Sequence, residues 1–302
     1  MQIPSLESPI ENIAQARLDR RKFLRKAGVF GLGAAASGLV LASGKSAQAQ
    51  QENQAEQTQD YVQNQDTVME IATAALIAED LASTFYYNAL TGPVIQSPQL
   101  AGAGGSAMNV TAAGNLGNVM YLRAALSEEI NHANAFRSVL GIPNSSKDPI
   151  QTFYFPAGTF NTLAAFTGML NALENAFIGA YLNAIQELSH MAAHSKGGGP
   201  AGDKGPYPKE TLIYYAKVVA SIMGVECEHR VLGRVISNTN PANNLNYEQT
   251  DGLNSVYNGP NSAVAALTPF LTPSTGPAYS LATALGNQAS VSYPAMDAAP
   301  LY

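Results

Sequence analysis

The chain has 302 residues, of which 46% are hydrophobic and 13% charged, with a formal net charge of −6 and a single cysteine. The acidic balance excludes the Lys- and Arg-rich surface that phosphate binding requires, so nucleic acid is not an expected partner. One cysteine also excludes a disulfide framework.

The first 49 residues form a separate segment. Arg20 and Arg21 in "LDRRKFLRKAG" precede the apolar run "VFGLGAAASGLVLAS" and the small-residue site "AQAQ". This order resembles a Tat export signal, which implies the Tat machinery as a partner, cleavage near Ala49 and a periplasmic or extracellular location. The alternative is a membrane anchor. The run is short and Gly-rich for a span of about 20 apolar residues, so no stable membrane span is expected after cleavage.

Cleavage would leave an acidic chain long enough for one large domain or two small ones. Residues 1–49 hold 7 of the 16 Lys and Arg and 3 of the 22 Asp and Glu, which leaves 9 basic and 19 acidic side chains and a charge of −10. Residues 50–65 are Gln-rich and polar, and predict a flexible leader.

Four segments with helical periodicity follow and predict an all-α four-helix bundle over residues 66–240. At about 1.5 Å per residue, each helix would be roughly 35–50 Å long. Gly141 is a suitable residue to end the second helix, and Pro208 a suitable one to begin the fourth. The predicted helices cover residues 66–90, 118–140, 160–194 and 208–238.

The connections indicate a ferritin-like topology. Between the second and third helices, "IPNSSKDPIQTFYFPAGT" is long enough, at about 3.3 Å per residue, to cross the whole bundle and make these helices parallel. The connection between the first and second helices is also long, and is either a functional lid or poorly ordered. Residues 241–302 are rich in Pro, Gly and Asn. They predict an irregular extension that packs on the bundle or on a partner subunit.

Two Glu–His pairs carry the chemistry. In "SEEINHANAF" Glu129 precedes His132 by three residues, and "MGVECEHRVLG" repeats this spacing with Glu226 and His229. Side chains three residues apart lie on one helical face, so each pair can bind one metal region.

Glu79 and Glu174 each interrupt an apolar stripe of the other two helices. A carboxylate among apolar residues is costly unless it is neutral, paired or metal-bound. Together with the two pairs they give four carboxylates and two imidazoles, which match two divalent cations. These donors suit iron or manganese, and zinc is not excluded. The alternative is chance spacing on packed helices.

This pattern resembles the di-iron carboxylate proteins of the ferritin-like superfamily, over about 170 residues. The exported domain, with its long loop and irregular tail, is similar to bacterial ferritin-like proteins related to plant desiccation-associated proteins. The resemblance implies two Fe ions, or alternatively two Mn ions, that react with O2 or H2O2. It also implies the metal ligands, which are Glu79, Glu129, His132, Glu174, Glu226 and His229.

Several nearby residues have two interpretations. Tyr86 and Tyr181 each follow a predicted ligand by seven residues, and either assist catalysis by bonding a ligand or donating an electron, or only pack in the core. Glu128 either orients an imidazole or, as we favour, is a solvated surface residue. Cys227 is expected in the core.

A third Glu–His pair lies outside the predicted cluster. Glu187, His190 and His194 have ligand-like spacing, but Glu187 lies about 20 Å along the helix from Glu174. They either stabilise the end of the third helix, which we favour, or form a surface site for incoming metal.

The predicted function is an exported ferritin-like protein with a di-nuclear Fe or Mn centre. Its expected activity is ferroxidase-like or peroxide-handling, in oxidative or desiccation stress. One alternative is a manganese catalase. The other is a non-enzymatic structural envelope protein with a structural metal or none. A homodimer is a further expectation.

Overall fold

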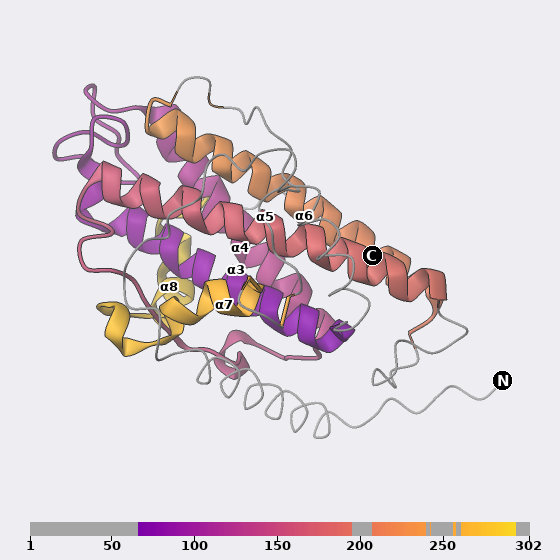
Figure 1. Cartoon of the computed structure of the whole chain (residues 1–302). Coiled ribbons are helices and arrows are strands. Elements are labelled where there is room, and N and C mark those ends of the chain that lie inside the picture. The colour runs from indigo at the N-terminus through magenta and orange to yellow at the C-terminus, as the bar shows by residue number, and fades with distance from the viewer. Residues whose placement is uncertain (1–65, 195–206, 240–241, 243–255, 258–260, 294–302) are drawn as a thin grey trace.

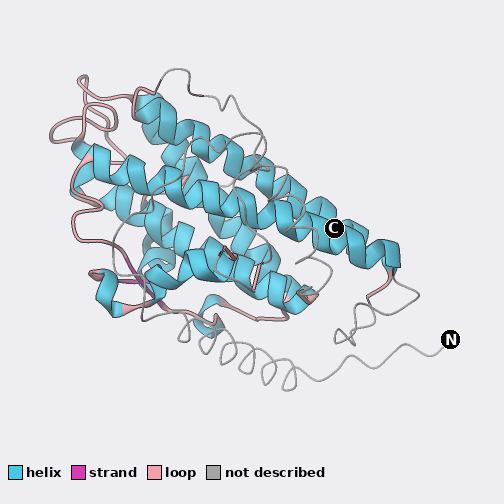
Figure 2. Cartoon of the chain, viewed as in Figure 1, coloured by secondary structure: helices cyan, strands magenta, loops and turns pink. Residues whose placement is uncertain are grey.

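The structure is a computed structural model, which describes residues 66–194, 207–239, 242, 256–257 and 261–293. The predicted signal over residues 1–49 and the predicted leader over 50–65 lie outside the described residues. Helices dominate the described part, so the predicted all-α four-helix bundle is confirmed (Figure 2). The four long helices are α3 (Val68–Thr91), α4 (Leu116–Val139), α5 (Leu163–His194) and α6 (Lys209–Ile236).

Local signals fix the ends of these helices. The Thr67 hydroxyl accepts a hydrogen bond from the Glu70 amide at 3.1 Å, and the Glu70 carboxylate accepts one from the Thr67 amide at 3.1 Å. This reciprocal cap satisfies two amides at the start of α3. Beyond the end of α4, Gly141 has φ = 65°, a conformation that favours glycine, and the next amide bonds back to the Arg137 carbonyl.

The helices pack as two pairs, α3 with α4 and α5 with α6. The Phe136 ring of α4 stacks on the Tyr181 ring of α5 with centroids 6.2 Å apart, while Glu129 and Glu174, seven residues earlier in each helix, lie in one cluster. The two helices therefore run parallel. The crossover between them follows the length of the bundle, as the sequence predicted (Figure 1).

Two short strands, not predicted from the sequence, join this crossover to the C-terminal extension. β1 (Thr152–Tyr154) pairs antiparallel with β2 (Ala278–Ser280), with Phe153 opposite Tyr279. Beside them, the buried Phe155 ring contacts the Phe85 ring of α3 at a centroid distance of 5.6 Å. Three-residue strands carry too short an alternation to be seen in a sequence.

The described part of the extension packs on the bundle of its own chain. It contains α7 (Ala263–Leu267) and α8 (Leu281–Asn287), and α8 lies against α3 (Figure 1). Beyond α8, the Arg123 guanidinium donates to the carbonyls of Val291 and Ser292 at 2.9 and 3.0 Å. The Ser127 hydroxyl donates to the Tyr293 carbonyl at 2.6 Å, so residues 291–293 are bound to α4 by three side-chain hydrogen bonds.

The connection from α3 to α4 folds against the bundle. Leu100 and Ala101 are fully buried, and the Asn118 side-chain amide donates to the Gln99 carbonyl at 2.8 Å. Of the two interpretations of this loop, poor order is therefore wrong. The 3₁₀ turns of the described part are η1 (Pro93–Gln96), η2 (Ser145–Lys147), η4 (Thr268–Leu271), η5 (Pro273–Thr275) and η6 (Gln288–Ser290). Within the described ranges, no helix combines the length and hydropathy needed to span a bilayer.

Candidate metal centre

Six ionisable side chains from all four long helices meet in the interior of the bundle. α3 and α5 each supply one glutamate, and α4 and α6 each supply a Glu–His pair. The four glutamates are at most 2% exposed, and the imidazole side chains of His229 and His132 are 3% and 12% exposed. The side chains brought together are Glu79, Glu129, His132, Glu174, Glu226 and His229.

The six side chains form two groups that share two carboxylates. The ligating atoms within each group all lie within 4.8 Å of one another. We call Glu79 and His132, together with the shared Glu129 and Glu226, the Glu79 subsite. The Glu174 subsite consists of Glu174 and His229 with the same two shared carboxylates.

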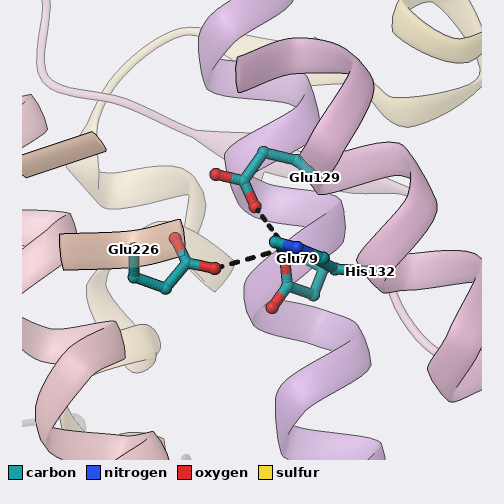
Figure 3. A group of neighbouring side chains, drawn as sticks. All are labelled: Glu79, Glu129, His132 and Glu226. Carbon is teal, nitrogen blue, oxygen red and sulfur yellow. Dashed lines mark ion pairs between the residues drawn. The ribbon is translucent and has the colours of Figure 1, made fainter. Parts of the chain in front are cut away.

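Each shared carboxylate presents one oxygen to each subsite. Glu129 Oε2 lies 3.6 Å from Nδ1 of His132, and its Oε1 lies 3.0 Å from Nδ1 of His229. Glu226 does the same, with Oε1 3.3 Å from His132 Nδ1 and Oε2 3.2 Å from His229 Nδ1. Figure 3 shows Glu129 and Glu226 reaching the His132 ring from two different helices. This is the arrangement of a carboxylate that bridges two ions.

The spacing of the donor atoms fits a metal ion. Two ligands that each lie about 2.1 Å from one ion stand about 3.0–3.4 Å apart in octahedral or tetrahedral geometry. His132 Nδ1 lies 3.3 Å from Glu79 Oε2, and His229 Nδ1 lies 3.9 Å from Glu174 Oε1. We call Glu79 and Glu174, which belong to one subsite each, the terminal carboxylates. The distances from the two imidazole Nδ1 atoms to the terminal and shared carboxylates therefore span 3.0–3.9 Å, close to the range that one ion imposes.

Hydrogen bonding also indicates that the cluster fits a cation. A buried polar atom without a hydrogen bond costs about 1–3 kcal/mol, and a charged one costs more. Several such atoms in one place are therefore unusual unless a cation satisfies them. Within the described part of the chain, the site atoms that make no hydrogen bond are Glu79 Oε2, both Glu129 oxygens, His132 Nδ1, Glu174 Oε2 and Glu226 Oε1.

Burial and mutual repulsion set the charges of the cluster. Desolvation, reinforced by the charge of Glu226, raises the pKa of Glu79 and of Glu174 well above the ordinary value. Desolvation also acts on Glu129, but the charge of the nearby His229 and the ion-pair contact with His132 outweigh it and lower the pKa of this carboxyl. The surrounding carboxylates raise the pKa of both imidazoles against desolvation. Without metal, protons therefore neutralise part of the cluster.

The two tyrosines bond to the terminal carboxylates across the bundle. The Tyr86 hydroxyl of α3 donates to Glu174 Oε1 of α5 at 2.6 Å, and the Tyr181 hydroxyl of α5 donates to Glu79 Oε1 of α3. Each tyrosine follows the glutamate of its own helix by seven residues, and the structure pairs it with the glutamate of the opposite helix. The exchange gives the site an approximate two-fold symmetry.

The interpretation of Glu128 needs correction. Its side chain is 44% exposed, as a surface position implies, but its Oε2 lies 2.8 Å from Nε2 of His229. The alternative that it orients an imidazole is therefore the one the structure shows. The Tyr86 ring also packs edge-on against the His229 ring, with centroids 5.6 Å apart.

Glu187, the acid of the third Glu–His pair, does not lie at the surface. Glu187 is fully buried, its Oε1 accepts a hydrogen bond from the Asn183 side-chain amide at 3.2 Å, and the repulsion of Asp66 adds to desolvation in raising its pKa to about 9. His190 is half-buried, and among the described residues no metal-binding group includes either residue. The side chain of His194 lies outside the described residues. Cys227 is half-buried and not in the fully buried core where it was expected.

Sequence reasoning missed a second buried charge cluster beside the site. Arg137 Nη2 lies 2.5 Å from Asp80 Oδ1 and 2.7 Å from Asp148 Oδ2, and its Nε donates to the same Asp148 oxygen at 2.9 Å. All three residues are at most 5% exposed. The cluster links Asp148 of the crossover to Arg137 of α4 and to Asp80, the residue after Glu79 in α3. The available signal was Asp80, a second acidic residue in an apolar helix. The sequence alone did not indicate its partners, because they lie in distant segments.

The fold and the site together define a class of protein, an all-α bundle built around a buried carboxylate–imidazole cluster that is compatible with a two-metal site. Residues 65–197 match the family model of the ferritin-like domain. This match and the observed bundle support the ferritin-like superfamily. The matched residues cover α3 to α5 and end before α6, which supplies Glu226 and His229. No curated protein and no solved structure matches the chain.

Proposed function

We propose that this chain is an exported ferritin-like redox protein with a di-nuclear iron or manganese centre. The observation that carries the proposal is the pair of groups that share Glu129 and Glu226, with one oxygen of each shared carboxylate facing each imidazole. A structural site for a single ion would need neither the second imidazole nor the second terminal carboxylate.

The proposed reaction is the oxidation of ferrous iron by O2 or peroxide. Two ferrous ions are the substrate, and together they give two electrons to one oxidant. With O2 as the oxidant, two protons are taken up and one hydrogen peroxide is formed; with hydrogen peroxide, two protons are taken up and two water molecules leave. Four carboxylates stabilise the higher charge of the oxidised ions, and the buried position limits access of bulk water.

The two tyrosines position the terminal carboxylates by donating hydrogen bonds to them. Tyr86 holds Oε1 of Glu174 and Tyr181 holds Oε1 of Glu79, while Oε2 of each of these carboxylates accepts no hydrogen bond. In the proposed reaction these phenols would assist catalysis by supplying a proton at the terminal carboxylates.

A manganese catalase is the second candidate, because the same donor set suits manganese. The two candidates predict opposite changes in dissolved oxygen. In air-saturated buffer, protein loaded with Fe(II) should consume O2 as the iron is oxidised, whereas protein loaded with Mn(II) should evolve O2 from peroxide if it is a catalase. An oxygen electrode measures both. If neither loaded form exceeds the rate of the free metal, the redox proposal is wrong and a structural envelope protein with bound metal remains.

Export by the Tat pathway is part of the proposal and rests on the sequence of residues 1–49 alone. Replacing both Arg20 and Arg21 with Lys should keep the uncleaved precursor in the cytoplasm. Cleavage of the unaltered chain near Ala49 should be visible by mass spectrometry of the exported protein. An oxidative or desiccation stress role outside the cytoplasm would follow from this location, and export of the double variant at the normal level would contradict it.

A further inference from the structure

The two halves of the site correspond in their six candidate ligands and two tyrosines, but one neighbouring position differs in a way that bears on metal affinity. Glu79 and Tyr86 of α3 correspond to Glu174 and Tyr181 of α5, and each tyrosine donates to the glutamate of the other helix. The Glu–His pair of α4 likewise corresponds to the pair of α6.

The exception is the residue before each shared carboxylate. On α4 this residue is Glu128, and on α6 it is the half-buried Val225. Glu128 Oε2 lies 2.8 Å from Nε2 of His229, the ring nitrogen that faces away from the cluster. Val225 has no oxygen to offer His132. Among the described residues, every recorded ion-pair contact of His132 is made through Nδ1.

A carboxylate behind an imidazole changes how that ring binds a metal. By accepting a hydrogen bond from Nε2–H, Glu128 favours the ring tautomer of His229 that keeps a lone pair on Nδ1, the nitrogen that lies 3.0 Å from Glu129 Oε1 and 3.2 Å from Glu226 Oε2. The same contact fixes the ring orientation and increases the basicity of Nδ1. His132 lacks this support and is also the more exposed of the two side chains, at 12% against 3%.

We propose that the two subsites have unequal affinity, with Glu128 as a positioning residue that makes the Glu174 subsite the tighter one. The first divalent cation binds there and the second occupies the Glu79 subsite. This inference rests on the proposed two-metal centre but not on its redox reaction. It gives the centre an order of loading that the symmetry of its six ligands alone would not predict.

The test is a titration of metal-free protein with Mn(II), with free Mn(II) measured by electron paramagnetic resonance. The wild type should bind two ions in two resolved steps. Glu128→Gln should weaken the tighter step by about 10–100-fold, the usual effect of removing a carboxylate that supports a metal-binding imidazole. Glu228→Gln is the matched control, because Glu228 is an exposed glutamate beside His229 on α6, and its titration should equal that of the wild type.

A second variant tests the same inference by adding the missing group. Val225→Glu places a carboxylate at the position that corresponds to Glu128, and should tighten the weaker step toward the tighter one. Circular dichroism shows whether Val225→Glu folds. If it does not fold, the titration of Glu128→Gln alone tests the unequal affinity of the two subsites. Two equal steps in the wild type, or a Glu128→Gln titration identical to that of Glu228→Gln, would overturn the inference while leaving the two-metal centre intact. Absence of binding in the wild type would overturn both.

Discussion

Replacement of Arg137 by Met should destabilise the fold strongly, because it leaves two carboxylates without their cation. Arg137 is 5% exposed, and its guanidinium contacts Asp80 at 2.5 Å and Asp148 at 2.7 Å. Asp80 and Asp148 are themselves 0% and 4% exposed. Methionine fills a similar volume without the charge, so the variant isolates the electrostatic contribution.

The expected loss is about 3–5 kcal/mol, the usual effect of breaking a buried ion pair from one side. That is a large fraction of the roughly 5–15 kcal/mol that stabilises a typical domain. Burial already raises the pKa of Asp80 and of Asp148, so without Arg137 these carboxyls would take up protons in the folded state. The folded variant then binds more protons than the unfolded chain, and the loss should shrink as pH falls from 7 toward 5.

Urea unfolding of metal-free protein at both pH values measures the effect. Arg123→Met is the matched control on the same helix, because Arg123 is half-buried and donates to backbone carbonyls at 2.9 and 3.0 Å without a carboxylate partner in those bonds. It should cost distinctly less. A loss below about 1 kcal/mol for Arg137→Met, or one equal to that of the control, would refute the assignment of this cluster as a buried electrostatic clamp.

Three further predictions concern buried acids and their partners. Glu187→Gln should be more stable than the wild type by a margin that grows with pH, by at most about 1.4 kcal/mol per unit between pH 5 and 9. Burial raises the pKa of Glu187 to about 9, so over this range the folded wild type keeps a proton that the unfolded chain has lost, and its free energy of unfolding falls as pH rises. A pH-independent difference in urea unfolding would contradict this. Tyr86→Phe should lower the free energy of unfolding of metal-free protein by about 1–3 kcal/mol, because the buried Oε1 of Glu174 loses its hydrogen-bond donor. An unchanged unfolding midpoint would argue against this hydrogen bond. Metal uptake should release protons and strengthen as pH rises, because the raised pKa of Glu79 favours its protonated form in the metal-free protein. Calorimetry in buffers of different ionisation enthalpy measures the protons released. If no protons are released, this prediction is wrong.

The helices and the six candidate ligands could be predicted because their signals are local. Apolar periodicity and terminal residues such as Gly141 placed the helices to within about three residues, and three-residue spacing placed each Glu–His pair on one face. The contacts between helices could not be predicted in this way. The bonds of Glu128 to His229 and of Tyr86 to Glu174 depend on how neighbouring helices are rotated and shifted, which no local pattern encodes.

Metal content is the most direct test of the two-metal centre. Mature protein purified without added metal should contain about two Fe or Mn ions per chain by inductively coupled plasma mass spectrometry. The double variant Glu129→Ala/Glu226→Ala should lose them because it removes both shared carboxylates, and Glu228→Ala should retain them. Little metal of any kind in the wild type, with the fold and Tm of the double variant unchanged, would contradict the two-metal centre and leave a structural protein.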